Sequence, residues 1–509
     1  MSDEDGEETE VFVFNPLPWE QEFSGIVPHH AVSVRGVGED PTASRHFQDR
    51  ERNYRDVDTL AGDDPGSIYN GQPILPPTSV PGYGYATVSS TDLETSDAWP
   101  FDERATVETD RYELTFDRKR GGISSWYDHE LDCEWVDENA DWPAAGFVHE
   151  RVADDDHDHA RSLLFRYDEG HDWHISVTGT GDAERGFQSD WNAERTGPER
   201  VVRHRVYETP LGYDVRQRLA HPALESDVAL RVLVPERGET VIVEASWVMG
   251  QTTHPEATYL AFPFELADPS AYVDVGDVAI ETGVDQLEGS VYDYYTAQRW
   301  VEVANDDRGV TVGTPVNPMV QFGDFTFAEN AADGAIDEGT VLGWVTNTYW
   351  ETNFRASQPG LVRARYHLSP HDGSFDEAAA HRRGLEAEFA EPLVQSMEEP
   401  AVDDPPLEAE TSLLSLPKPP VLVQQLRPAN VDDGILHPGG GRDRDGVLLT
   451  LHNATDGSRD ATVGAGTVSF DQAFRVSYLG DKELEELPIE NERVTVALEG
   501  RETAVLHLK

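Results

Sequence analysis

The stretch RYELTFDRKRGGISSWYD, residues 111–128, decides the class of fold. In its first half Tyr112, Leu114 and Phe116 alternate with polar or small residues, so their side chains share one face of a strand. A Gly-Gly pair at 121–122 then supplies turn chemistry before a second strand, ISSWYD. The stretch therefore predicts an antiparallel β-hairpin with one buried face.

Strands with similar patterns recur through the middle of the chain, and helical periodicity is rare there. Clear examples cover residues 228–234, 240–249 and 309–313, with turn residues between them. So many half-buried strands pack most naturally as facing antiparallel sheets. We therefore predict a mainly β fold built of antiparallel sandwiches.

The sequence indicates one helix near residue 380. Ser374 and Glu377 form a capping-box pattern ahead of an Ala-rich stretch, and Pro392 marks the end of that stretch. These signals predict a helix over about residues 375–390.

Changes in composition along the chain predict its domains. Short apolar runs separated by Pro and Gly indicate a small β unit near the start, and a stretch rich in Glu, Asp and Pro indicates an extended linker after the helix. The predicted organisation is an acidic tail (1–10), a small β domain (11–98), a large β-sandwich domain ending in the helix (99–395), a linker (396–420) and a small C-terminal β-sandwich (421–509).

The charge of the chain is extreme. It has 97 acidic and 39 basic residues and a formal net charge of -58, and its only lysines are Lys119, Lys418, Lys482 and Lys509. A packed protein that keeps Arg and discards Lys in this way suits very high salt, where charge repulsion is screened within a few Å. Disorder or a basic partner is the rival interpretation, but 38% hydrophobic residues favour a folded core.

The same composition bears on location and partners. Cys133 is the single cysteine, and the acidic start lacks the basic end and apolar run of a secretory signal. No stretch approaches the ~20 apolar residues of a membrane span, and an acidic surface should repel nucleic acid. We expect a protein of a salt-adapted cytoplasm that binds neither membrane nor nucleic acid.

An ordered series of motifs resembles the C-terminal β-sandwich region of family 38 glycoside hydrolases, the α-mannosidases. The motifs are VFVFNPLPW (11–19), PGYGYATV (81–88), the hairpin at 111–128, AQRWVEV (297–303), RGVTVGTP (308–315), the segment at 366–393 and LTLHNAT (449–455). The resemblance covers nearly the whole chain and implies a large sandwich of galactose-mutarotase-like type. The sequence of residues 346–354 is similar to that of a divergent, haloarchaeal-type branch of the family.

The resemblance implies retaining hydrolysis of α-mannosides by an aspartate nucleophile beside a zinc ion, with a second carboxylate as general acid. In the family those groups lie on a barrel that precedes the β region, whereas only ten residues precede the first matching motif here. None of the eighteen histidines begins the His-x-Asp pattern of the zinc site. We therefore assign no catalytic residue and expect no cofactor in this chain, with zinc only in a separate catalytic domain.

Residues 346–355 are the strongest candidate for contacts to a sugar. An aromatic face covers the C–H side of a pyranose, while amide, carboxylate and guanidinium groups bond to its hydroxyls. The alternative is a strand in which Trp350 and Phe354 are simply buried. The predicted substrate-binding residues of this segment are Tyr349, Trp350, Glu351, Asn353 and Arg355.

Two weaker candidates lie elsewhere. Arg299 and Trp300 offer a forked donor beside an aromatic ring, although Trp in such a pattern is commonly core. The runs at 154–159 and 171–174 contain Asp and His, but they lack a recognisable metal-ligand spacing and suit a solvated loop. We predict substrate contacts for the first pair and no metal site.

The sequence leads us to expect one of three functions. In the favoured one, the chain is the β-sandwich portion of an α-mannosidase-like enzyme that acts with a separately encoded catalytic barrel. Alternatively, it is a stand-alone carbohydrate-binding protein, or a truncated inactive fragment. Carbohydrate is the expected ligand in the first two cases, and whether the chain is an enzyme depends on the partner.

Overall fold

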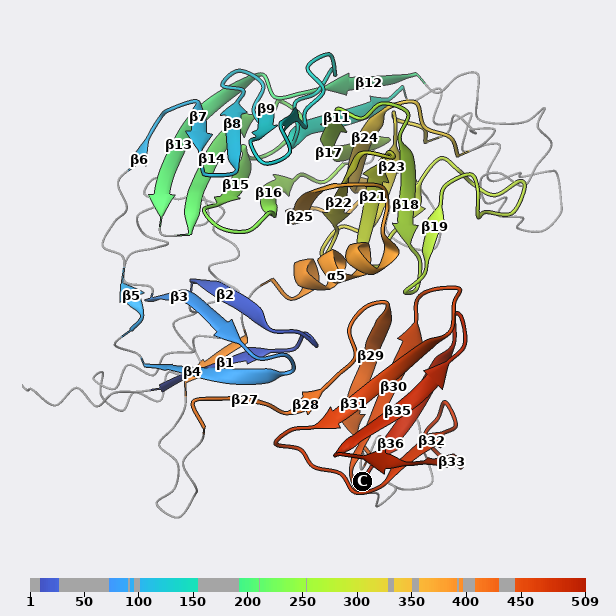
Figure 1. Ribbon diagram of the computed structural model, residues 1–509. Coiled ribbons are helices and arrows are strands. Elements are labelled where there is room, and N and C mark those ends of the chain that lie inside the picture. Colours follow the sequence, from blue (N-terminus) through green and yellow to red (C-terminus); the bar gives the residue numbers. More distant parts are fainter. Residues whose placement is uncertain are drawn as a thin grey trace, which may run out of the picture. The chain divides into compact units, whose positions relative to one another are not determined.

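The computed structural model describes residues 10–26, 73–89, 92–95, 101–153, 192–209, 211–252, 254–327, 334–349, 357–390, 393–396, 408–429 and 445–509. The chain divides into two compact units, of which unit 1 comprises residues 1–40, 68–98 and 377–509, and unit 2 comprises 41–67 and 99–376. In the described part of the chain, strands dominate both units (Figure 1).

Unit 2 is built around a ten-stranded antiparallel sheet. Its strand order is β19-β18-β21-β22-β25-β16-β15-β14-β13-β6. The strands are β6 (Phe101–Asp102), β13 (Arg200–Thr209), β14 (Gly212–Ala220), β15 (Val228–Pro235), β16 (Val241–Met249), β18 (Ser270–Asp274), β19 (Ala279–Glu281), β21 (Trp300–Ala304), β22 (Arg308–Gly313) and β25 (Gly360–Asp372).

Two smaller sheets complete unit 2. The six-stranded sheet has the order β12-β11-β17-β24-β23-β20, and the four-stranded sheet has the order β10-β9-β8-β7. Their strands are β7 (Thr106–Glu108), β8 (Tyr112–Phe116), β9 (Ile123–Asp128), β10 (Cys133–Glu134), β11 (Gly146–Val152), β12 (Ala193–Thr196), β17 (Glu256–Phe264), β20 (Tyr295–Thr296), β23 (Met319–Phe322) and β24 (Gly339–Asn347).

One apolar cluster joins the three sheets. Trp126 of the four-stranded sheet, Phe262 of the six-stranded sheet and Trp247 of the ten-stranded sheet are all fully buried in it. On β15 and β16 the residues of one parity point into this core, which is why these two strands show period-two burial. Strand β17 is instead buried on both faces. We call the surface of each sheet that points away from this core its outer face. The predicted mainly β sandwich fold is confirmed.

The hairpin at residues 111–128 forms as predicted. Strand β8 pairs with β9, and Tyr112, Leu114 and Phe116 are buried. Gly122 has a φ of 81°, and a Cβ there would lie 2.5 Å from the backbone oxygen of Ala144, so only glycine fits the turn.

Unit 1 contains two small sheets, a C-terminal sandwich and helix α5 (Glu377–Glu388). The small sheets have the orders β26-β1-β4-β27 and β2-β3-β5, and the sandwich has the orders β28-β31-β35-β34 and β29-β30-β36-β32-β33. The strands are β1 (Glu10–Asn15), β2 (Gln21–Ile26), β3 (Pro73–Val80), β4 (Gly84–Ser89), β5 (Glu94–Thr95), β26 (Leu393–Ser396), β27 (Glu410–Ser412), β28 (Leu414–Ser415), β29 (Val421–Pro428), β30 (Val447–Asn453), β31 (Arg459–Ala465), β32 (Ala473–Val476), β33 (Glu483–Leu487), β34 (Ile489–Glu490), β35 (Arg493–Leu498) and β36 (Thr503–Leu508).

The VFVFNPLPW segment begins unit 1 with strand β1 and a stabilised turn. Val11 and Val13 are fully buried, and Asn15 donates from Nδ2 to the backbone oxygens of Trp19 at 2.8 Å and Val80 at 3.0 Å. The buried amide therefore supplies the hydrogen bonds that the proline-containing turn requires.

Helix α5 lies inside the predicted range of 375–390 but belongs to unit 1, whereas we expected it to end a large domain at residue 395. Arg501 of the C-terminal sandwich donates to Glu377 at 2.7 Å, and Trp19 donates to Glu386 at 3.0 Å. Strand β26 then pairs with β1. These contacts tie residues 377–396 to unit 1.

The predicted linker at 396–420 also needs correction in its second half. Residues 410–412 form β27, which pairs with β4, and residues 414–415 form β28. Leu414 and Leu416 are buried in the core of the C-terminal sandwich. The acidic and proline-rich composition of this segment did not indicate that the two leucines are buried. Their burial fixes the segment from residue 410 onward to the C-terminal sandwich.

No helix among the described residues is both long enough and apolar enough to pass through a membrane.

Candidate functional site

Tyr349 is the described member of the predicted sugar-binding segment. It follows strand β24 and is 4% exposed. Its hydroxyl donates to Oε1 of Glu150 at 2.6 Å, across 199 positions of sequence. The other predicted residues of this segment, Trp350, Glu351, Asn353 and Arg355, lie outside the described part of the chain.

Glu150 is the centre of a buried polar cluster on the outer face of the six-stranded sheet. Alternation along β11 places Glu150 on the same face as Val148 and Val152, away from the core shared by the three sheets. Glu150 is 1% exposed. A carboxylate at such a position must have donors close by, because burying an unpaired charge is costly.

Three donors reach the Glu150 carboxylate. Arg195 donates from Nε to Oε2 at 2.6 Å, while the hydroxyls of Tyr259 and Tyr349 donate to Oε1 at 3.2 and 2.6 Å. Gln321 donates in turn to the Tyr259 hydroxyl at 3.2 Å. These five residues, which we call the Glu150 cluster, come from β12, β11, β17 and β23 and from the residues after β24.

Aromatic rings surround the Glu150 cluster. The rings of Phe327 and Tyr349 are stacked with centroids 5.3 Å apart, and Tyr259 stacks on Trp344 at 5.8 Å. The guanidinium carbon of Arg195 lies 4.2 Å from the ring centroid of Phe325. Offset and stacked rings of this kind fix one another's orientation, so Tyr349 has little freedom to turn.

The electrostatics of the cluster keep its tyrosines protonated near neutral pH. Burial raises the pKa of Tyr349 well above its usual value of about 10, and the neighbouring Tyr259 and Glu150 raise it further. Burial likewise raises the pKa of Tyr259, with Glu150 adding to the effect. Both hydroxyls therefore stay protonated and serve as donors. Because both oxygens of Glu150 are engaged, we assign the carboxylate a positioning role.

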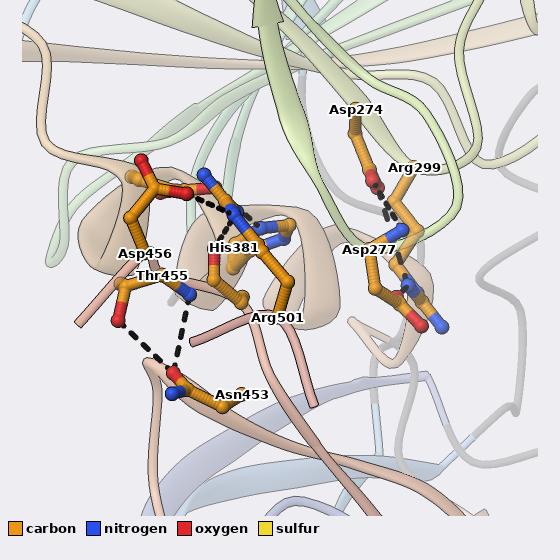
Figure 2. A network of polar contacts seen from close by, with 10 residues as sticks. Asp274, Asp277, Arg299, His381, Asn453, Thr455, Asp456 and Arg501 are labelled. Carbon is orange, nitrogen blue, oxygen red and sulfur yellow. Dashed lines mark hydrogen bonds and ion pairs between the residues drawn. The ribbon is translucent and has the colours of Figure 1, made fainter. Parts of the chain in front are cut away.

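Arg299 and Trp300 do not join the Glu150 cluster. Arg299 forms an ion pair with Asp277 and lies 4.0 Å from Asp274 (Figure 2). Trp300 is fully buried on β21, with its ring centroid 6.0 Å from that of Phe375. The tryptophan therefore occupies the core position that the sequence left as the alternative, and no face of its ring is open to a ligand in this structure.

The sequence missed four members of the cluster: Glu150, Arg195, Tyr259 and Gln321. The sequence did contain a signal for Glu150. In GFVHERV it is a charged residue on the same side of the strand as Val148 and Val152. Its donors come from positions up to 199 residues distant, so only the sheet order identifies them.

Metal-ligating side chains do not converge in the described ranges. No three of the His, Cys, Asp or Glu residues described come close enough together to hold an ion. The runs at 154–159 and 171–174 lie outside those ranges. The described residues therefore do not fit a zinc ion.

Comparison with known proteins gives a likeness of structure without one of sequence. No family model matches the chain, and no curated protein matches its sequence. A family 38 glycosyl hydrolase protein from Enterococcus faecalis matches 99% of this chain and 59% of its own, with 10% identity and a TM-score of 0.58. An α-mannosidase from Enterococcus faecalis V583 matches 99% of this chain and 56% of its own, with 10% identity and a TM-score of 0.60.

A putative aldose 1-epimerase from Escherichia coli also matches, over 54% of this chain and 100% of its own, but its TM-score of 0.29 decides nothing. The chain spans little more than half the length of the two Enterococcus structures, so these comparisons bear on its fold alone. Over that shared part, the chain has the fold that the motifs predicted, that of the C-terminal β region of family 38 glycoside hydrolases.

Proposed function

We propose that this chain is the β-sandwich portion of an α-mannosidase-like glycoside hydrolase and that it acts on carbohydrate together with a separately encoded catalytic barrel. The observation that supports this most directly is the fold match, which covers 99% of this chain but 59% and 56% of the two Enterococcus structures. The acidic composition supports a salt-adapted cytoplasm as its location.

The Glu150 cluster would serve this function by fixing the start of the sugar-binding segment. Tyr349 is held by its hydrogen bond to Glu150 and by stacking on Phe327. Trp350 follows Tyr349 directly in the sequence, and Asn353 comes three residues after Trp350. A rigid anchor at Tyr349 holds the start of the sugar-binding segment in one position.

Catalysis in this proposal belongs to the barrel. Retaining hydrolysis needs a nucleophilic carboxylate and an acid–base carboxylate about 5 Å apart across the glycosidic bond. Glu150 is already saturated with donors, and Asp214, another buried carboxylate of unit 2, is paired with two arginines. The chain contributes binding and orientation, for which we assign Tyr349, Trp350, Asn353 and Arg355.

The test is hydrolysis of a chromogenic α-mannoside in molar salt. The purified chain, a barrel protein encoded by a neighbouring gene, and their mixture are assayed separately. We expect the mixture to exceed the sum of the two by at least about tenfold, since orientation by a second protein acts on the transition state. Trp350→Ala should reduce that gain, whereas Tyr478→Ala, at a residue 74% exposed in the C-terminal sandwich, should not.

Hydrolysis by this chain alone would overturn the assignment of catalysis to the barrel. Equal activity of the barrel protein with and without this chain would overturn the joint action.

A carbohydrate-binding protein without catalysis is the second candidate. It is favoured by the completeness of the Glu150 cluster within this single chain. Calorimetric binding of mannosides by the chain, weakened by Trp350→Ala and unaccompanied by hydrolysis in any mixture, would select this candidate.

A further inference from the structure

A buried polar corner lies where the chain crosses from the six-stranded to the ten-stranded sheet of unit 2. Strand β12 ends at Thr196 in the first sheet, and β13 begins at Arg200 in the second. Three titratable side chains lie at this crossing: His149 on β11, His221 directly after β14, and Glu256 at the start of β17. They are 5, 6 and 7% exposed. We call these three residues and Thr196 the polar corner.

Both ring nitrogens of His221 are engaged. The backbone N–H of Ala223 donates to Nδ1 at 3.2 Å, so Nδ1 carries no proton. The neutral imidazole therefore carries its proton on Nε2, which lies 3.2 Å from Oγ1 of Thr196 and donates to it. A second proton on Nδ1 would face the N–H of Ala223. His221 thus fits the polar corner only as a neutral side chain.

The surroundings of His221 also disfavour a charge on its ring. The ring centroid of His149 lies 5.2 Å from that of His221, and the ring of Phe147 lies at 5.5 Å. Oε2 of Glu256 lies 3.4 Å from Nε2 of His149, so this carboxylate faces His149. Burial, reinforced by His149, lowers the pKa of His221 to about 4 from its usual value near 6.5.

Strand β12 connects the polar corner to the Glu150 cluster. Thr196, which accepts the bond from His221, follows Arg195 on this strand. Arg195 donates to one oxygen of Glu150 at 2.6 Å, and Tyr349 donates to the other at 2.6 Å. Among the described strands, β12 has a neighbour on one side only, and it is four residues long. Side-chain contacts therefore contribute more to its position than they do in a central strand.

A second connection runs through Glu256 to the residue before Tyr349. The N–H of Glu256 donates to Oγ1 of Thr348 at 3.0 Å, and the N–H of Thr348 donates to the backbone oxygen of Glu256 at 2.9 Å. The carboxylate of the same Glu256 contacts His149. The polar corner thus reaches residues 348 and 349 by two separate routes.

We propose that His221 is a positioning residue for the sugar-binding segment, and that it performs this role in its neutral form. Neutral His221 holds Thr196 and with it β12, so Arg195 stays on Glu150 and Tyr349 stays fixed at the start of the segment. A proton taken up by His221 breaks the contact with Ala223, and the polar corner opens. That the segment binds sugar rests on the proposed function, whereas the effect of His221 on β12 does not.

The expected pH dependence follows from the two states of the polar corner. The pKa of His221 is about 4 in the closed state and returns to about 6.5 in an open state in which water reaches the ring. The closed state is therefore fully favoured above pH 6.5, loses ground as the pH falls toward 4, and changes no further below that. Between pH 7 and 4.5 the equilibrium constant for opening should rise about fiftyfold.

Hydrogen exchange on the full chain in constant molar salt measures this opening. The protection factors of the amides of residues 193–196 and of Thr348, corrected for the intrinsic effect of pH on exchange, are compared at pH 7 and pH 4.5. His221→Gln and His221→Asn are the test variants, and neither side chain titrates. Gln places a nitrogen donor near the position of Nε2, whereas Asn places an oxygen acceptor near that of Nδ1 and loses the bond to Thr196.

We expect protection at residues 193–196 of the parent chain to fall about fiftyfold between pH 7 and 4.5, and protection of Thr348 to fall with it. His221→Gln should keep the protection seen at pH 7 and lose its pH dependence. His221→Asn should lose about fivefold already at pH 7, which is the effect of one hydrogen bond. His129→Gln, at a side chain 36% exposed in another sheet, should behave as the parent does. Circular dichroism establishes that each variant is folded.

Three results would overturn the proposal. The first is unchanged protection of the parent chain between pH 7 and 4.5, which needs no variant. The second is an equal loss in the parent chain and in His221→Gln, because another group would then cause the opening. The third is a loss at residues 193–196 without any loss at Thr348, which would separate β12 from the sugar-binding segment.

The mannoside assay separates this inference from the proposed function. Protection that follows His221 as expected, without hydrolysis in any mixture, would uphold the positioning role and reject the proposed function. Where the mixture does hydrolyse the mannoside, KM should rise in His221→Asn and return toward the parent value in His221→Gln, with kcat unchanged. Equal KM values in all three chains would reject the role of His221 and leave the proposed function standing.

Discussion

The six-stranded and the ten-stranded sheet of unit 2 each bury a carboxylate on their outer face. The donors that surround the two carboxylates differ in their charge. Glu150 and Asp214 are both 1% exposed. Glu150 receives two tyrosine hydroxyls and one guanidinium, whereas Asp214 receives two guanidiniums. The first set contains one charged donor, and the second contains two.

That difference separates a cluster with mostly neutral donors from one with charged donors. Around Glu150 the donors are consumed and aromatic rings complete the packing, so the cluster can orient a neighbouring segment. Around Asp214 the bonds are forked, because Arg216 and Arg231 each contact the carboxylate with two nitrogens. Arg231 also reaches Glu244 through Nη1 at 2.8 Å.

The largest effect should come from neutralising Asp214. Asp214→Asn would leave Arg216 and Arg231 without their central anion, and we expect the free energy of unfolding to fall by about 4 kcal/mol. Urea denaturation at pH 7 and constant salt measures the change. Glu244→Gln is the control, since Glu244 is about a third exposed and should lose less than about 1 kcal/mol. Similar losses in the two variants would remove the special standing of Asp214.

Acid titration should reveal the buried His367, which lies on strand β25 two positions after Arg365. Burial, reinforced by the charge of Arg365, lowers the pKa of His367 to about 3 from its usual value near 6.5. Below pH 6.5 the unfolded chain takes up a proton that the folded chain refuses, so stability falls as pH decreases toward 3. The expected loss approaches about 1.4 kcal/mol per pH unit below pH 6.5 and amounts to about 2 kcal/mol between pH 6.5 and 4.5.

His367→Asn should flatten that dependence relative to the parent chain, and His129→Asn, at a side chain 36% exposed, should not. His221, whose pKa burial lowers to about 4, is unchanged in both variants and contributes equally to their slopes. If His367→Asn leaves the pH dependence of the free energy of unfolding unchanged, His367 titrates normally in the folded protein.

Local patterns predicted the elements better than they predicted the sites. The hairpin at 111–128 and helix α5 follow from alternation, glycine and capping signals within about twenty residues. Trp300 was predicted to contact substrate because of its neighbour Arg299, yet it is fully buried. An adjacent pair in a strand points to opposite faces, so sequence proximity is a poor guide to a shared site.

The Glu150 cluster and the row of charged residues around Arg216 and Arg231 both depend on sheet register. Arg205 and Arg365 are 160 positions apart and come into one row only through the pairing of five strands. Tyr349 was predicted as a site residue from its own segment, but its partner Glu150 lies 199 positions earlier. Such long-range pairings leave no mark in the composition of either segment.

The smallest effect should come from removing a hydroxyl from the Glu150 cluster, because that donor is neutral. Tyr349→Phe removes one hydroxyl from Glu150 but keeps the ring stacked on Phe327, so we expect a loss of about 1 kcal/mol in the free energy of unfolding. Tyr259→Phe is the matched variant, with a longer bond of 3.2 Å to the same oxygen. If Tyr349 positions the segment that follows it, Tyr349→Phe should weaken mannoside binding more than Tyr259→Phe at similar stability. Equal binding by the two variants would restrict the Glu150 cluster to holding the sheet together.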